Sequence, residues 1–283
     1  MTQTWSAIAT IRSRVSHRTY DGRGLPPSVR AELEAALREP PRPPFGSRVR
    51  IALLDTVSDN TPVSLGTYGV IRGAKSFLAG AVHAGDHAEE DFGFVLEWAI
   101  LRATSLGLGT CWLGGTLRRG EFGTAMGLEP GESIPAVTPV GYPRVRRNLL
   151  DAATRWAAGS KNRKPWSELF FRGTFDAPLP EADAGAYATV LEMVRWAPSA
   201  SNRQPWRIVM DRNGGAFELF LQRTAGYGYP GVDLQRIDMG IAMCHFELTA
   251  RELGLAGAWK FDAAGSPALP ARTSYIASWV AGG

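Results

Sequence analysis

The sequence predicts an α+β fold in which mixed β-sheets are layered with helices, and it predicts that this arrangement occurs twice, as two degenerate copies. Two observations favour this fold. Two long helices with apolar stripes are followed by nearly the same residues, and each is preceded by a helix and a strand in the same order. Half of a 283-residue chain is long enough to bury a core of its own.

The first long helix is predicted from Asp86 to Leu106 and the second from Asp233 to Leu253, because apolar residues recur at helical spacing before a terminating glycine. Matched residues in and behind the two helices are each separated by 147 positions: Asp91 and Asp238, Gly93 and Gly240, Ala103 and Ala250, Leu106 and Leu253, Leu108 and Leu255, Trp112 and Trp259. A constant offset over so many pairs favours an ancient duplication.

The elements before each long helix also correspond. Helices are predicted over 28–38 and 184–196, and strands closed by an aspartate over Val49–Asp55 and Trp206–Asp211. A hairpin turn at 213–215 leads to a further strand over 217–223. Each half is therefore predicted to contain a helix, a strand, a long helix and a further strand, in that order. The basic, Ala/Gly/Asn-rich stretch 144–164 is the expected connector, which predicts one half over 1–165 and another over 166–283.

Several classes of protein and site are disfavoured. No run approaches the roughly 20 apolar residues that span a bilayer, and the N-terminus does not resemble a signal peptide, so we expect a cytoplasmic enzyme or binding protein. The net charge of +4 is scattered, which argues against a nucleic-acid partner. Cys111 and Cys244 are predicted to be buried free thiols. His83 and His87 lack a third ligand nearby, so we expect surface or loop roles and no metal.

The two halves differ in three segments that suit ligand binding. Arg14, Ser16 and Arg18 alternate along a segment that, if extended, places two guanidiniums and a hydroxyl on one side, which suits a phosphate group. The second half has apolar residues and glycine at the corresponding positions. Conversely, Pro198–Asn202 offers hydroxyl and amide groups that the Pro-rich stretch 40–46 lacks. The pair Gly114-Gly115, after a short apolar strand, lets main-chain N–H groups approach a flat ligand.

These segments, together with Lys161-Asn-Arg163 and the continuation of the second segment to Trp206, resemble the FMN-dependent nitroreductase family over nearly the whole chain. The chain is similar to single-chain, internally duplicated members, in which one polypeptide supplies both halves of a pseudo-dimer. The resemblance implies a nitroreductase-like fold and a flavin site to which both halves contribute.

Site roles follow from the resemblance. It implies that the FMN phosphate and ribityl groups are held by Arg14, Ser16, Arg18, Lys161 and Arg163. It implies that the isoalloxazine is contacted by Pro198, Ser199, Ala200 and Asn202, with Ala200 where the family often has a second hydroxyl. Leu113, Gly114 and Gly115 would lie near the flavin N5, and Gly114 stands where some members have Glu. Trp112 and Trp206 are candidates to border the ring plane.

The implied function is an oxidoreductase that transfers hydride from NADH or NADPH through FMN to a nitroaromatic, a quinone or a similar acceptor. The cofactor carries the chemistry, so no dedicated catalytic side chain is expected. Because each half keeps what the other lacks, we expect one FMN per chain and no need for a homodimer. Two alternatives stay open: a non-catalytic flavin carrier or sensor, and a flavin-dependent dehydrogenase of a specialised small-molecule or peptide-derived substrate.

Overall fold

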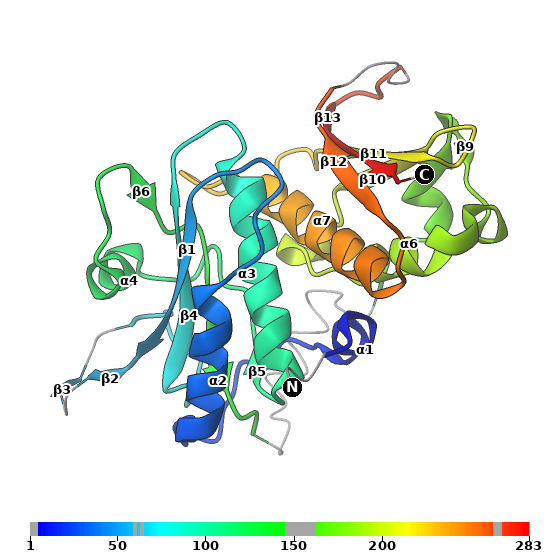
Figure 1. Ribbon diagram of the computed structural model, residues 1–283. Helices are drawn as coiled ribbons and strands as arrows, with labels where there is room; N and C mark the ends of the chain where they lie inside the picture. Colours follow the sequence, from blue (N-terminus) through cyan, green and yellow to red (C-terminus); the bar gives the residue numbers. More distant parts are fainter. Residues whose placement is uncertain (1–4, 59–60, 63–64, 145–161, 263–267, 283) are drawn as a thin grey trace. The chain divides into compact units, whose positions relative to one another are not determined.

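The computed structural model describes residues 5–58, 61–62, 65–144, 162–262 and 268–282 (Figure 1). The chain divides into two compact units, Met1–Ala157 and Ala158–Gly283, where the sequence predicts a boundary after residue 165. Most of the predicted connector, including Lys161, lies outside the described residues. No helix in the described ranges combines the length and the apolar character needed to cross a membrane.

The first unit is built on one antiparallel sheet. Its strands lie in the order β1 (Val49–Asp55), β4 (Ser76–His83), β7 (Val137–Gly141) and β5 (Gly109–Thr110), and the short β6 (Glu132–Ser133) also pairs with β4. A separate ribbon joins β2 (Val57–Ser58) and β3 (Thr61–Pro62). The helices are α1 (Ala7–Ser13), α2 (Pro27–Arg38), α3 (Ala88–Ser105) and α4 (Arg119–Met126).

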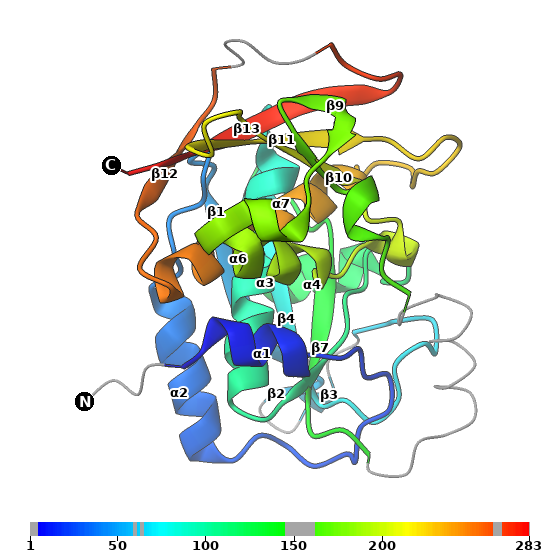
Figure 2. The ribbon, with the colours of Figure 1, turned by 90° about the vertical axis from the view of Figure 1, so that its right-hand side faces the viewer.

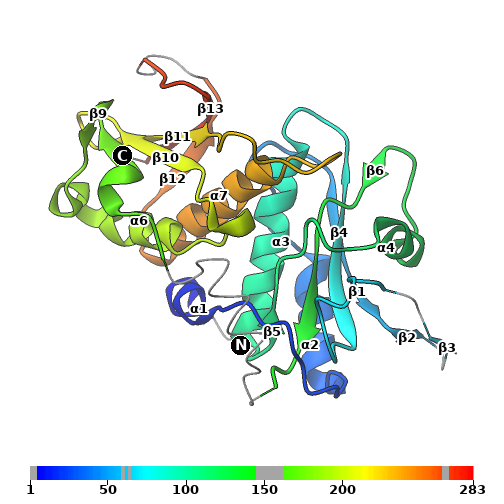
Figure 3. The ribbon, with the colours of Figure 1, turned by 180° about the vertical axis from the view of Figure 1, so that it is seen from behind.

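The sheet of the first unit lies between α3 and α4, as Figures 1 and 3 show. Successive side chains of β4 point to opposite faces of the sheet, one toward α3 and the other toward α4. The Phe77 ring meets the Phe122 ring of α4 edge to face, with 5.4 Å between their centroids. On the α3 face, a Cβ at Gly80 would lie 2.7 Å from the Phe92 ring, so only glycine lets this helix approach so closely.

The second unit is built on a six-stranded sheet. Its order is β12 (Gly257–Lys260), β13 (Thr273–Ala281), β11 (Ala216–Gln222), β10 (Trp206–Met210), β8 (Phe170–Arg172) and β9 (Thr174–Pro178). The pair β8 and β10 is parallel, and the other pairs are antiparallel. Its helices are α6 (Ala188–Arg195) and α7 (Leu234–Glu252), with 3₁₀ turns at Trp166–Glu168, Glu181–Tyr187 and Ala200–Asn202.

In the second unit, α6 and α7 cover one face of the sheet (Figure 2). An aromatic core joins them to the strands. The Phe246 ring of α7 lies 5.6 Å from Phe217 of β11 and 5.5 Å from Trp279 of β13, between ring centroids. A smaller apolar cluster of Phe171, Val209 and Phe220 is packed separately.

The two units share a strand order. The path β1-β4-β7-β5 and the path β10-β11-β13-β12 are both antiparallel throughout. In each unit the long helix, α3 or α7, follows the second strand of the path and leads directly to the last one. The prediction of a mixed α+β fold with two helix-and-sheet assemblies is confirmed.

Most predicted elements are confirmed, and one needs correction. β1 matches the predicted strand end to end, the hairpin at 213–215 joins β10 to β11, and both long helices lie within their predicted ranges. The helix predicted over 184–196 begins only at Ala188. Gly185, with φ 55° and ψ −132°, breaks the helical backbone, and the residues before it form a 3₁₀ turn. Cys111 and Cys244 are buried free thiols, as expected.

Candidate functional site

The predicted phosphate-binding segment of the first unit is extended and anchored along its main chain. α1 ends at Arg14, whose N–H donates to Thr10. Beyond it, Ser16 forms a β-bridge with Thr110 of β5, and the His17 N–H donates to the Thr110 carbonyl at 2.8 Å. Arg14 and Ser16 therefore lie in extended backbone, the conformation that the prediction assumed for this segment.

The Arg14 side chain lies inside the unit and is only 7% exposed. Its Nε is 4.0 Å from Oε1 of Glu97, a fully buried residue of α3. The other oxygen of Glu97 accepts a hydrogen bond from Trp112 Nε1 at 2.6 Å. Arg14 Nη1 is buried and has no hydrogen-bond partner. An unsatisfied guanidinium donor is costly, and an anionic oxygen would satisfy it.

The glycine-rich segment offers main-chain donors beyond Leu113. Leu113 itself is committed to the fold, since its side chain is 3% exposed and its N–H and carbonyl both pair with Val137. Arg119 donates to the Gly114 carbonyl and to the Pro135 carbonyl. The N–H groups of Gly114 and Gly115 make no main-chain hydrogen bond within the described residues, so they stay available to a ligand.

The segment 198–204 of the second unit, which contains the predicted ring-binding residues, has a strained backbone. Ser201, Asn202 and Gln204 have φ values of 48°, 54° and 49°, a region that non-glycine residues rarely adopt. Three such residues within four positions persist only where surrounding contacts hold them. We call residues 198–204 the left-handed loop. A strained backbone of this kind is typical of ligand-binding segments.

Hydrogen bonds inside the second unit fix this loop. Ser199 Oγ accepts from the Gln204 N–H at 2.9 Å, and Arg163 Nη1 donates to Asn202 Oδ1 at 2.7 Å. Arg163 also donates to the Trp196 carbonyl at the end of α6. The structure therefore brings together Arg163, Ser199 and Asn202, three of the residues that the resemblance implies. Trp206, in contrast, is fully buried in the core and does not line a surface.

A buried carboxyl group that the sequence analysis missed as a site residue lies beneath the left-handed loop. Asp238 of α7 is 2% exposed, and its Oδ1 accepts from the Ala200 N–H at 2.9 Å. Its Oδ2 is buried and has no partner. Burial raises the pKa of Asp238 well above its ordinary value, which a single N–H donor does not offset.

The matched Asp91 of α3 holds a loop in the same way but more completely. Its two oxygens accept from the N–H groups of Phe45 and Ser47, at 2.9 and 2.7 Å. Burial raises the pKa of Asp91 as well, although both hydrogen bonds oppose the shift. The two aspartates therefore differ in one respect: both oxygens of Asp91 accept a hydrogen bond, whereas one oxygen of Asp238 has no partner.

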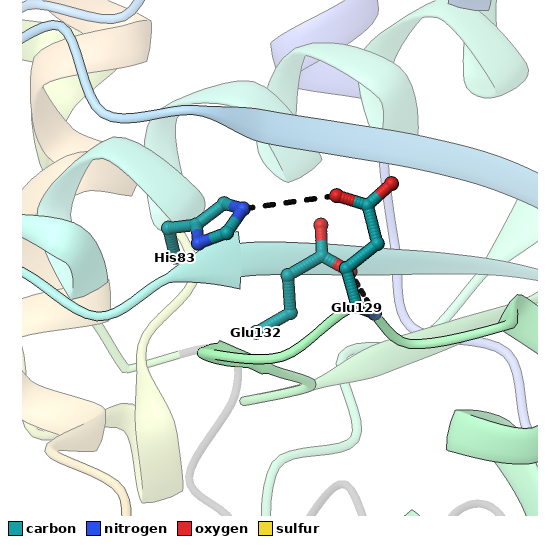
Figure 4. A group of neighbouring side chains, drawn as sticks. All are labelled: His83, Glu129 and Glu132. Atoms are coloured by element: carbon teal, nitrogen blue, oxygen red, sulfur yellow. Dashed lines mark hydrogen bonds and ion pairs between the residues drawn. The ribbon is translucent and has the colours of Figure 1, made fainter.

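One group of side chains within the described residues has the spacing of metal ligands: His83, Glu129 and Glu132 (Figure 4). His83 Nε2 lies 4.0 Å from Glu129. However, Arg50 donates to both oxygens of Glu132, at 2.8 and 2.6 Å, and this pairing lowers the pKa of Glu132 to about 2. Because an arginine already saturates that carboxylate, we assign no metal to this group. His87 is elsewhere engaged, stacked on Phe45 at 3.9 Å.

The structure thus places the predicted residues in two local sets, one in each unit, and Lys161 lies outside the described residues. Arg14, Ser16, Arg18 and the glycine pair belong to the first unit; Arg163 and the left-handed loop belong to the second. Glu97 and Asp238, which anchor these sets, were missed. The signal that could have found them is a carboxylate on the apolar stripe of a long helix, where an ionised group is seldom buried without a partner.

Comparisons with known proteins give the chain a family. A family model described as "Putative TM nitroreductase" matches residues 7–250. A protein from Thermotoga maritima described as a "putative nitroreductase" is 20% identical, covers 99% of this chain and 95% of its own, and has a TM-score of 0.60, a likeness of fold. No curated protein matches the chain.

Shorter nitroreductases also match in part. A nitroreductase with bound FMN from Bacteroides fragilis is 20% identical and covers 52% of this chain and 92% of its own, with a TM-score of 0.39. A "putative nitroreductase" from Ralstonia eutropha is 17% identical and covers 52% and 87%, with a TM-score of 0.41. Since the family model spans most of the sequence, the chain belongs to the nitroreductase family that this model describes.

Proposed function

We propose that the chain is an FMN-dependent oxidoreductase that passes hydride from NADH or NADPH to an organic acceptor such as a nitroaromatic or a quinone. Membership of the nitroreductase family supports this proposal. The observation that carries the cofactor assignment is the buried, unpartnered Nη1 of Arg14, which lies in the segment that the sequence predicts to grip a phosphate. FMN, when bound, supplies the hydride chemistry.

The residues of the chain bind and orient the flavin. Arg14, Ser16 and Arg18 hold the phosphate, and the free N–H groups at Gly114 and Gly115 face the ring edge that carries hydride. Glu97 keeps the guanidinium of Arg14 in place, which limits the entropy lost on binding. No side chain needs to act as a general acid or base in this proposal.

The left-handed loop supplies hydrogen-bonding groups to the flavin ring. Because Arg163, Asp238 and Gln204 fix its backbone in advance, the loop does not have to reorganise when the ring binds. Lys161 is proposed to assist with the phosphate. In this proposal one flavin takes contacts from both sets of residues, a homodimer is not required, and each chain binds one FMN.

We infer that the two units arose by duplication. The shared strand order supports this inference, as does the matched pair of buried aspartates, each on the long helix of its unit and each holding the N–H of a loop that precedes the first strand. The repeated residues at an offset of 147 positions add to it. After duplication, each copy kept a different part of one binding site.

The test is reconstitution with FMN, followed by titration and stopped-flow reduction. We expect one flavin per chain, reduction by NADH or NADPH, and reoxidation by menadione or nitrofurazone. Protein that stays colourless after reconstitution would refute the proposal, and two flavins per chain would refute the division of one site between copies. Flavin that binds but is not reduced would favour the carrier or sensor alternative.

The residue-level test removes the two arginines of the predicted phosphate-binding segment. Arg14→Ala combined with Arg18→Ala is expected to weaken FMN binding by 100-fold or more, since a charge-assisted hydrogen bond contributes roughly 1.5–3 kcal/mol. Arg12→Ala is the matched control, because Arg12 is exposed on the same segment. Arg50 is a poorer control, since its removal leaves Glu132 unpaired. Equal weakening by the control and the double variant would contradict the assignment.

A further inference from the structure

A cluster of cations in the second unit is not used by the proposed flavin contacts. It consists of Lys164, Arg203 and Arg207, which meet around Gln204. The Gln204 side chain accepts from the Lys164 N–H at 2.8 Å, and the Gln204 carbonyl accepts from Arg207 Nη1 at 3.1 Å. Arg203 is the neighbour of Gln204 in the chain. Gln204 thus contacts the main-chain N–H of Lys164 and the guanidinium of Arg207, and Arg203 precedes it in the chain.

Arg207 lies on β10 and is 7% exposed. Nη1 donates to the carbonyls of Gln204 and Trp206, and this part of the guanidinium stabilises the left-handed loop. In the described part of the chain, Nε and Nη2 make no hydrogen bond, and no carboxylate lies within 4.0 Å of the guanidinium. Neither nitrogen is fully enclosed, since neither counts among the buried atoms that lack a partner. Arg207 Nε and Nη2 are therefore two donors that the described residues leave unused.

The charges of this cluster are not balanced. Burial lowers the pKa of Arg207 to about 10, and only Glu168 acts against the shift. Burial also lowers the pKa of Lys164, and the positive charges of Arg207 and Arg203 add to that effect. Three cations therefore face one acidic residue, whose carboxylate forms no ion pair with them. Holding like charges together in a half-buried place is unfavourable unless an anion joins them.

From this arrangement we propose that the second unit binds a phosphate monoester, with Arg207 Nε and Nη2 and the Lys164 ammonium as ligands and Arg203 on the exposed side. A guanidinium fork next to an ammonium group suits a dianionic phosphate. Two phosphate esters could occupy it: the 2′-phosphate of NADPH, which the proposed function leaves without a site, and the FMN phosphate, whose binding here would replace its assignment to Arg14, Ser16 and Arg18. The existence of the site does not depend on the proposed function, whereas the choice of source rests on it.

The experiment titrates inorganic phosphate into the flavin-free full chain carrying Arg14→Ala and Arg18→Ala, so that the grip of the first unit cannot contribute. Isothermal titration calorimetry is expected to show saturable binding. Adding Lys164→Gln is expected to weaken it about tenfold, the effect of losing roughly one charge-assisted contact. The Lys164 side chain makes no hydrogen bond to the described residues, so the substitution should leave the fold intact. Lys260→Gln, on an exposed strand of the same unit, is the control and should leave the affinity unchanged.

Competition separates the two sources. Displacement of phosphate by adenosine 2′,5′-bisphosphate assigns the site to the dinucleotide, and displacement by FMN assigns it to the flavin; both results support a phosphate-ester site. The proposal is overturned if phosphate does not bind saturably, if Lys164→Gln binds it as tightly as the Lys260→Gln control, or if neither ester displaces it. A chain that fails to bind or reduce FMN would refute the proposed function without changing the phosphate titration.

Discussion

Replacing Asp238 by asparagine tests whether a buried, half-satisfied carboxyl group lies beneath the left-handed loop. The folded chain holds the Asp238 proton more tightly than the unfolded chain does, because burial raises the pKa well above 3.8. The contribution of Asp238 to stability is therefore most favourable at low pH and falls as pH rises from the ordinary pKa to the raised one. Over that window each pH unit costs up to about 1.4 kcal/mol.

Asparagine keeps the acceptor for the Ala200 N–H and removes the titration. The difference in unfolding free energy between Asp238→Asn and wild type should be small at pH 4 and should grow in favour of the variant by up to about 1.4 kcal/mol for each pH unit above that, until the raised pKa is reached. Urea unfolding at several pH values, followed by tryptophan fluorescence, measures this difference and cancels the other titrating groups. Parallel pH profiles for the two proteins would refute the reasoning.

Asp91→Asn is the matched control, because Asp91 uses both oxygens where Asp238 uses one. An asparagine cannot accept from both Phe45 and Ser47, so one buried N–H loses its partner. At pH 4 this variant should be about 1–3 kcal/mol less stable than wild type, whereas Asp238→Asn should be close to wild type. Equal effects of the two substitutions at pH 4 would show that the second oxygen of Asp238 is satisfied after all.

Two further predictions concern buried acids of the first unit. Glu97→Gln should lower the melting temperature of the flavin-free chain, because it leaves the buried Arg14 uncompensated, and should reduce the increase in melting temperature that FMN produces, because Arg14 is no longer held in place; an unchanged increase would contradict the role of Glu97. The Arg50 hydrogen bonds hold the Glu132 pKa at about 2, so this pair stabilises the fold above about pH 4.5 and the effect is lost as pH falls toward 2. Glu132→Gln should therefore be less stable than wild type at pH 7, with a gap that narrows in acid; a gap that stays constant in acid unfolding would refute the pairing.

Local patterns predicted several elements. β1 was recognised as an apolar run closed by an aspartate, and the long helices were recognised because apolar residues recur at helical spacing before a glycine. β4 was missed because α3 and α4 bury both of its faces, so its residues form a continuous apolar run without a period. The break at Gly185 was missed because a single glycine within a helical pattern does not reveal its φ angle.

The sequence predicted those parts of the site that depend on residue type. It did not predict those that depend on the direction of a side chain. The spacing of Arg14, Ser16 and Arg18 identified a cationic segment, but the sequence could not show that the Arg14 side chain lies beside a buried carboxylate. The same holds for Arg207, which the sequence analysis passed over as one arginine among many. A buried strand position and the absence of an ion-paired carboxylate single it out, and both depend on strand pairing between residues distant in sequence.

The two aspartates show how duplicated units come to differ in function. In the first unit, two N–H donors satisfy Asp91, and residues 40–46 of the loop that it holds carry no hydroxyl or amide side chain to offer a ligand. In the second unit, Asp238 holds a loop whose backbone is left-handed at three positions. One oxygen of Asp238 stays without a hydrogen-bond partner. The strained backbone and the unsatisfied oxygen therefore destabilise the unit whose loop presents ligand-binding groups. This is expected where a strained backbone is kept for binding. If this view is correct, Asp238→Asn gains stability at neutral pH without losing the loop, and FMN affinity changes less than stability does.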